Sequence, residues 1–240
     1  MKEMKTLPPS LQDTTTFSRR EFTSAMVSTY GMTEPQVAYD LKKRLDNGML
    51  VRAGWGRYSL PLKRRYLHHY SDTAMDVVNL INNGFHHVDF QIFELIQLND
   101  FINHQIAHNS VFVTIENEMV DYVFDSLWEV YPGKVMLKPK LDQYYRYLQD
   151  NEIIVGRLPS ESPKGITEPW MSRLEKILVD VFTDKLISAI VPEGEKKIII
   201  DGAFSDYMID QNTMLRYAKR KGTEKRMEEV LRVYGKAMLQ

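Results

Sequence analysis

Asp180 and the segment Glu195-Lys196-Lys197 contain the residue types that best fit a catalytic centre in this sequence. Metal-dependent nucleases place an Asp and a Glu-x-Lys on adjacent strands, where the carboxylates bind Mg²⁺ and the lysine steadies the attacking water. Here Asp180 is expected in the middle of a helix, and Glu195 in a turn formed by Pro192, Glu193 and Gly194. Because this differs from the nuclease arrangement, a nuclease-like enzyme is kept only as an alternative.

Other catalytic and cofactor chemistry has no recognisable motif. His104 and His108 have the i, i+4 spacing of a zinc-binding helix, but Gln105 replaces the required Glu and no third ligand is evident. The chain has no cysteine, no Gly-x-Gly-x-x-Gly, no P-loop and no Gly-x-Ser-x-Gly. We therefore expect a protein that is not an enzyme and that holds no cofactor or metal.

The segment from Thr33 to Asn47 is the candidate for reading DNA. Val37, Leu41 and Leu45 recur at helical spacing and should face a core. A recognition helix enters the major groove by its N-terminal end, where an outward glutamine can make a bidentate contact to adenine. The outward residues of this helix are Gln36, Tyr39, Lys42 and Lys43.

Further basic residues follow this helix. Asp40 would be repelled by phosphate unless Arg44, four residues later, pairs with it. A hairpin after the helix would bring cations and an aromatic ring to the DNA backbone or the minor groove, and a basic run behind it would add sequence-independent affinity. The same module could instead dock a protein, with its charges solvated. These additional residues are Arg52, Trp55, Arg57, Lys63, Arg64 and Arg65.

The elements that would position these residues follow from capping signals. Ser18 and Glu21 have the spacing of a capping box, and Gly31 is suited to end the helix that they begin. Thr33 and Gln36 have the same spacing and start the second helix. Short strands at 49–53 and 57–60 follow around a glycine-rich turn. The order helix, turn, helix, hairpin predicts a winged helix-turn-helix domain over residues 1–70.

Residues 71–240 predict a second, α/β domain. Apolar strands alternate there with helices, which favours a mostly parallel sheet of four to five strands followed by C-terminal helices. Residues 158–168 should form a loop, and Gly222 should separate two final helices within 203–239. We expect strands at 88–92, 110–115, 134–138, 152–156 and 197–201, and helices at 98–108, 117–131, 140–150 and 169–190.

Charge is divided unevenly along the 240 residues. Residues 1–70 carry a net charge of +6, residues 71–212 carry −12 and residues 213–240 carry +5. This division suggests that the parts meet different partners. The basic tail could contact DNA, an acidic partner or the acidic middle of its own chain. No apolar run is long enough to span a bilayer, so we expect a cytoplasmic protein with no membrane partner.

Two segments carry a resemblance to a known family. The segment from Phe22 to Leu60, and especially the run from Leu45 to Tyr58, resembles the N-terminal winged helix of AbiEi-type antitoxins of bacterial abortive-infection systems. The run from Arg173 to Asp180 is similar to a Glu-Lys-x-Leu-x-Asp run in the C-terminal part of those proteins. The two matches occur in the family's order and cover about a fifth of the chain.

The resemblance implies a transcriptional autorepressor and antitoxin. Such a protein binds operator DNA upstream of its own gene through the winged helix, and its C-terminal domain counters a cognate nucleotidyltransferase-like toxin. The protein itself is expected to be a monomer or a weak dimer, because inverted operator repeats would favour two copies on DNA and paired monomers supply them as easily as a dimer. A scaffold that binds only protein is the remaining alternative.

Overall fold

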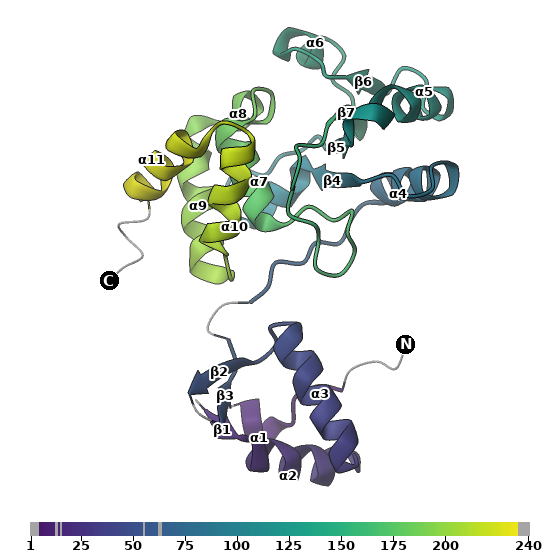
Figure 1. Ribbon diagram of the computed structural model, residues 1–240. Helices are drawn as coiled ribbons and strands as arrows, with labels where there is room; N and C mark the ends of the chain where they lie inside the picture. Colours follow the sequence, from purple (N-terminus) through teal and green to yellow (C-terminus); the bar gives the residue numbers. More distant parts are fainter. Residues whose placement is uncertain (1–4, 13, 15, 55, 62–63, 235–240) are drawn as a thin grey trace. The chain divides into compact units, whose positions relative to one another are not determined.

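The computed structural model describes residues 5–12, 14, 16–54, 56–61 and 64–234 (Figure 1). The chain divides into two compact units, Met1–Arg65 and Tyr66–Gln240. From the sequence we expected the boundary after residue 70. Each unit has its own hydrophobic core and is described separately below.

The first unit combines short helices with a three-stranded antiparallel sheet. Its strands lie in the order β1-β3-β2, so the strand before the helices pairs with the second strand of the hairpin. The core is formed mainly by apolar side chains of α2 and α3, such as Phe22, Met26, Val37 and Leu41. The elements are α1 (Pro9–Gln12), β1 (Phe17–Ser18), α2 (Arg19–Tyr30), α3 (Glu34–Asp46), β2 (Val51–Gly54) and β3 (Arg57–Ser59).

Local sequence signals account for the two longer helices. The backbone N–H of Ser18 donates to Glu21 Oε2 at 2.6 Å, and the backbone N–H of Glu21 donates to Ser18 Oγ at 3.2 Å. This capping box starts α2. Gly31 ends α2 with φ of 63°, in the left-handed region that favours glycine. Helix α3 then begins at Glu34, with Pro35 in its first turn.

The second unit contains a four-stranded sheet and most of the helices. Strands β5, β7 and β6 are parallel, and the edge strand β4 pairs antiparallel with β5. The strand order is β4-β5-β7-β6. The elements are α4 (Asp72–Gly84), β4 (Phe90–Glu94), 3₁₀ helix η1 (Leu95–Asp100), β5 (Ser110–Ile115), 3₁₀ helix η2 (Asn117–Met119), α5 (Val120–Val130), β6 (Val135–Leu137), α6 (Leu141–Arg146), β7 (Glu152–Arg157), α7 (Leu174–Thr183), α8 (Ile187–Ile190), α9 (Glu193–Asp206), α10 (Gln211–Arg220) and α11 (Glu224–Tyr234).

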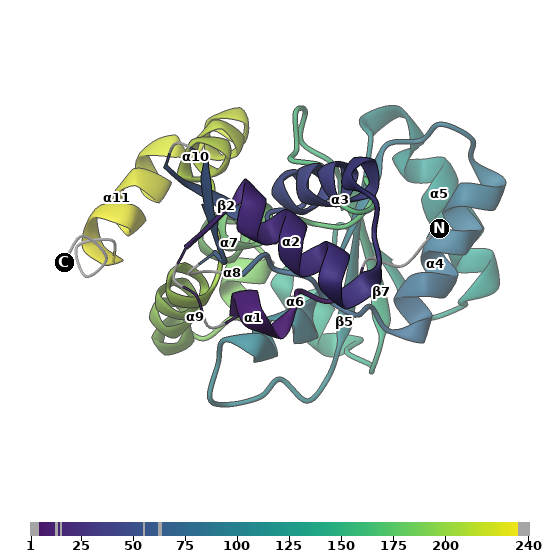
Figure 2. The same cartoon turned by 90° about the horizontal axis from the view of Figure 1, so that it is seen from below.

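Two layers of helices enclose this sheet. Apolar side chains of α4 and α5, such as Ile81 and Leu127, pack with one face of the strands. Side chains of α7 and α9–α11 form the other cluster, together with Phe112 and Ile154 from the opposite strand face. Figure 2 shows α4 and α5 side by side, away from α7–α11, and Figure 1 agrees. The mixed α/β class, the mostly parallel sheet and the C-terminal helices are therefore confirmed.

Several predicted elements were wrong. Residues 197–201, expected as a strand, belong to helix α9. Their isoleucines favour a strand by intrinsic propensity, but Ile199 and Ile200 are buried between helices, and tertiary packing overrides that preference. The single helix expected over 169–190 is interrupted after Thr183, where α7 ends. The helix expected over 98–108 is absent, because η1 ends at Asp100.

The other predicted elements agree with the structure to within a few residues, including the separation of α10 and α11 around Gly222. The sequence analysis predicted no helix at Asp72–Gly84, where the structure has α4. None of the helices in the described residues combines the length and the apolar composition that crossing a membrane requires.

Candidate functional site

The outer face of α3 presents the residues expected to read DNA. Val37 and Leu41 are buried on the inner face, as predicted. Tyr39 is 69% exposed, and Gln36 and Lys42 are also exposed on the outer face. The structure thus separates the two faces as the helical spacing indicated.

Three polar side chains of α3 have intramolecular partners. Gln36 Oε1 accepts the backbone N–H of Thr33 at 3.0 Å. A bidentate contact to adenine needs this same oxygen as an acceptor, so it would require the cap to open. Asp40 and Arg44 form a buried ion pair, as their spacing suggested. Asp40 therefore adds no free negative charge to the outer face.

Two arginines after α3, Arg57 and Arg65, donate hydrogen bonds to other residues of the first unit. Arg57 donates from Nε and Nη2 to Thr16 Oγ1 at 3.0 and 2.8 Å, which ties β3 to the segment before β1. Arg65 Nη2 donates to the backbone carbonyl of Asp46 at 3.0 Å, at the end of α3. Arg57 is exposed and Arg65 half-buried. Of the other predicted residues, Lys43 is half-buried, Arg52 and Arg64 are exposed, and Trp55 and Lys63 lie outside the described residues.

Sequence reasoning missed a basic hollow beside α3. Arg19 and Arg20, in the first turn of α2, line a hollow of about 570 Å³ together with Thr23, Glu34 and Ala38. The signal was available, since both arginines lie inside the capping box that we used to place α2. They extend the basic surface of the first unit beyond α3 and the hairpin.

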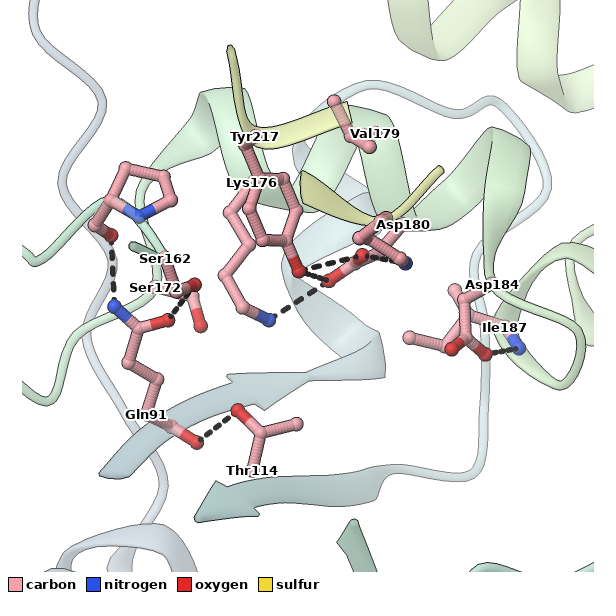
Figure 3. A network of polar contacts seen from close by, with 12 residues as sticks. Gln91, Thr114, Ser162, Ser172, Lys176, Val179, Asp180, Asp184, Ile187 and Tyr217 are labelled. Carbon is pink, nitrogen blue, oxygen red and sulfur yellow. Dashed lines mark hydrogen bonds and ion pairs between the residues drawn. The ribbon is translucent and has the colours of Figure 1, made fainter. Parts of the chain in front are cut away.

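The second unit contains a buried ion cluster around Asp180 (Figure 3). Lys176 Nζ lies 2.8 Å from Asp180 Oδ2, and Lys221 Nζ lies 2.5 Å from Oδ1. The hydroxyl of Tyr217 donates to Oδ1 at 3.1 Å. The side chains of Lys176 and Asp180 are only 3% and 7% exposed. One carboxylate thus accepts from two ammonium groups and a phenol, and the cluster has a net charge of +1.

The cluster controls the protonation of its members. Burial alone would raise the pKa of Asp180, but the charges and hydrogen bonds of Lys176 and Lys221 outweigh it and lower that pKa below its ordinary value. Burial and the nearby Asp180 carboxylate raise the pKa of Tyr217, so its hydroxyl stays protonated. Asp180 is therefore ionised at neutral pH, and its carboxylate oxygens already accept from Lys176, Lys221 and Tyr217.

The nuclease alternative is not supported by this geometry. Asp180 lies on α7, whereas Glu195 and Lys197 lie in the first turns of α9, so the adjacent-strand arrangement is absent from the part of the chain that the structure describes. Glu195 Oε1 contacts His104 Nδ1 at 2.8 Å. Across the described ranges, no group of three or more histidine or carboxylate side chains lies close enough to hold a metal ion.

Residues 36–236 match the profile of DUF6577, described as a family of unknown function. The chain belongs to the DUF6577 family. The match begins inside α3, so it includes the hairpin of the first unit and nearly all of the second. No curated protein matches the chain.

A second buried carboxylate of the DUF6577 protein connects α4 with the sheet. Glu94, at the end of β4, accepts from the backbone N–H and the hydroxyl of Ser71 at 2.9 and 2.6 Å, and from Asn109 Nδ2 at 2.7 Å. His68 Nε2 lies 3.5 Å from Oε2. Burial raises the pKa of Glu94, but the nearby His68 and the hydrogen bonds from Ser71 and Asn109 outweigh it and lower the pKa. Ser71 also caps α4, so Glu94 fixes where that helix begins.

Proposed function

We propose that the DUF6577 protein is a cytoplasmic, DNA-binding transcriptional autorepressor that also serves as the antitoxin of a bacterial toxin–antitoxin operon. Its first unit acts as a winged helix, with α3 in the major groove of operator DNA and the β2–β3 hairpin as the wing. The observation that carries the proposal is the exposed face of α3, where Tyr39 and Lys42 lie opposite a buried apolar stripe. This is the surface that a recognition helix presents to base edges.

Charge supports the same assignment. Residues 1–65 hold 12 Lys and Arg against 6 Asp and Glu, a net charge of +6. Because Asp40 is paired with Arg44 and buried, one of those acids lies away from the outer face of α3. A basic surface of this kind gains affinity by releasing counterions from DNA.

The antitoxin half of the proposal is supported by the resemblance of the Leu45–Tyr58 and Arg173–Asp180 runs to AbiEi-type proteins. The partner would be a nucleotidyltransferase-like toxin, countered by the second unit. Residues 66–240 hold 19 Lys and Arg against 26 Asp and Glu, a net charge of −7. That charge argues against nucleic acid as the partner of this unit. Rescue of growth when the chain is co-expressed with the neighbouring gene tests this half.

Fluorescence anisotropy with the duplex upstream of its own gene, against a scrambled duplex at two salt concentrations, tests DNA binding. We expect a Kd near ~10⁻⁸ M, at least ~10³-fold tighter than for scrambled DNA. Equal binding of both duplexes in the range of ~10⁻⁴ to 10⁻⁶ M would contradict the proposal.

Substitutions locate the surface. Tyr39→Ala should relax sequence preference, whereas Arg64→Ala should weaken binding to all duplexes and reduce the salt slope by about one unit. The matched control is Lys134→Ala, which removes an exposed cation from the second unit. If both first-unit variants bind like the Lys134→Ala control, the proposed surface is wrong.

A further inference from the structure

A cavity of about 400 Å³ lies at the carboxyl edge of the sheet in the second unit. All three parallel strands end there. Thr114 is near the end of β5, Arg157 ends β7, and Lys138 directly follows β6. Helices α7 and α8 line the opposite side, through Asp180 and Ile187 among others. The volume falls within the range of about 300–1,000 Å³ typical of small-molecule sites.

The topology explains why the sheet is open at this point. After β5 the chain enters α5, which packs on one face of the sheet, and after β7 it leads to α7, which packs on the other face. The connections after β5 and β7 therefore run to opposite faces of the sheet. Because β5 and β7 are neighbours, a crevice remains between their carboxyl ends. In open α/β sheets this switch point is where ligands bind.

The cavity is strongly cationic. Its five cations face two carboxylates, which leaves a net charge of +3. Asp180 is already shared by Lys176 and Lys221. Asp184 Oδ1 accepts the backbone N–H groups of Leu186 and Ile187 at 2.9 and 3.0 Å. Within the described residues, no carboxylate pairs with the remaining three cations. These are Lys138, Arg157 and Lys185.

Three unpaired cations come from three different segments. Lys138 follows β6, Arg157 ends β7, and Lys185 lies between α7 and α8. All three side chains are exposed, and their convergence on one cavity raises the positive potential there. An anion is attracted by that potential. Phosphate matches the site well, since Arg binds it bidentately and Lys binds it as a point charge.

Part of the cavity lining is apolar. The rings of Phe93 and Phe112 stack with centroids 5.6 Å apart, and Ile154 and Ile187 complete the apolar part. An inorganic ion would make no favourable contact with these side chains. A ligand with a flat, apolar ring would pack against them.

We propose that this cavity binds a nucleotide, with its base against the apolar lining and its phosphate among Lys138, Arg157 and Lys185. A second cavity, of about 660 Å³, shares Arg157, Pro159 and Lys221 with the first, but Asp89, Glu116 and Glu161 also line it, so the phosphate is assigned to the first cavity. The assignment does not depend on DNA binding by the first unit.

Isothermal titration calorimetry of the full chain tests the proposal, with nucleoside mono- and diphosphates, the corresponding nucleosides and inorganic phosphate as probes. At least one nucleotide should bind saturably and at least about tenfold more tightly than its nucleoside and than inorganic phosphate. Raising the salt concentration should weaken it. Equal binding of phosphate alone would mean that only the anion is recognised, and equal binding of the nucleoside would remove the role of the cations. Either result overturns the proposal.

The strand β6 supplies a matched pair of variants. Lys138 follows its carboxyl end and lines the cavity, whereas Lys134 precedes its amino end and is exposed. Lys138→Ala and Arg157→Ala should each weaken nucleotide binding about tenfold, and Lys134→Ala should leave it unchanged. Both sites are exposed, so circular dichroism should show an intact fold. No saturable binding of any nucleotide, or equal binding by all three variants and the parent, would overturn the assignment.

Discussion

Asp180 is the acceptor shared by two largely buried ammonium groups, so its removal isolates both. Asp180→Asn keeps the size of the side chain but leaves Lys176 and Lys221 without their anion. Breaking a buried ion pair by removing one partner costs about 3–5 kcal/mol. We therefore expect Asp180→Asn to lower the free energy of unfolding of the second unit by that amount, measured by urea denaturation at pH 7.

The control for this variant is an exposed pair. Arg232 and Glu229 lie 3.9 Å apart, with 71% and 68% of their side chains exposed. Glu229→Gln should therefore change stability by less than about 0.5 kcal/mol. Equal effects of the two substitutions would show that the Asp180 cluster does not stabilise the unit.

Glu94 makes stability depend on acid pH. Folding lowers the pKa of Glu94, so the ionised side chain stabilises the folded state in full at pH values above the ordinary pKa of 4.5. This stabilisation is lost as the pH falls from 4.5 through the lower pKa of the folded state. Glu94→Gln has already lost the charge-assisted hydrogen bonds, each worth about 1.5–3 kcal/mol. The variant should have a lower free energy of unfolding than the parent at pH 7, and this difference should become smaller below about pH 4.5. Urea unfolding at several pH values measures this, and curves that stay parallel would contradict it.

At the scale of elements, Gly31 determines how α2 ends. Its φ of 63° is left-handed, and no heavy atom lies within 4 Å of where a Cβ would stand. Gly31→Ala therefore tests backbone conformation without a clash, and it should destabilise the first unit by about 1–2 kcal/mol. Gly31→Asn should cost less, because asparagine tolerates this conformation. Hydrogen exchange of amides in α2 and α3 reports both changes, and equal protection in the two variants would rule out the conformational explanation.

The sequence predicted elements well where the deciding contacts are local. The capping box of Ser18 and Glu21, the helix stop at Gly31 and the apolar strands at 110–115 and 152–156 all match the structure. The isoleucines of α9 were predicted to form a strand but lie in a helix, because burial between helices overrode their preference for strands.

The geometry of the sites was also predictable only where the contacts are local in sequence. The outer face of α3 and the Lys176–Asp180 pair could be foreseen from i, i+4 spacing. The contacts of Lys221 and Tyr217 with Asp180 join residues about 40 apart in the chain, so they depend on how α10 packs on α7. The contact of Arg57 with Thr16 is also distant in sequence. The cationic cavity escaped notice because its lysines and arginine come from separate segments that only the fold brings together.

At the scale of the whole molecule, separate cores predict separable functions. The core of the first unit is built from residues 7–50, and the two clusters of the second unit begin at residue 74. A chain of residues 66–240 contains every residue of those two clusters, so it should fold without the first unit. Circular dichroism should show a cooperative thermal transition for it.

The same fragment separates the two proposed sites. It lacks α3 and the basic residues 1–65, so it should bind operator DNA no better than scrambled DNA. It retains Lys138, Arg157 and Lys185, so its affinity for a nucleotide should stay within about twofold of that of the full chain, because the cavity is formed within the second unit alone. Calorimetry and anisotropy on the fragment and the full chain measure both. If the fragment is folded but binds operator DNA like the full chain, the winged helix is not the reader. If it loses nucleotide binding while folded, the cavity is not a site of the second unit alone.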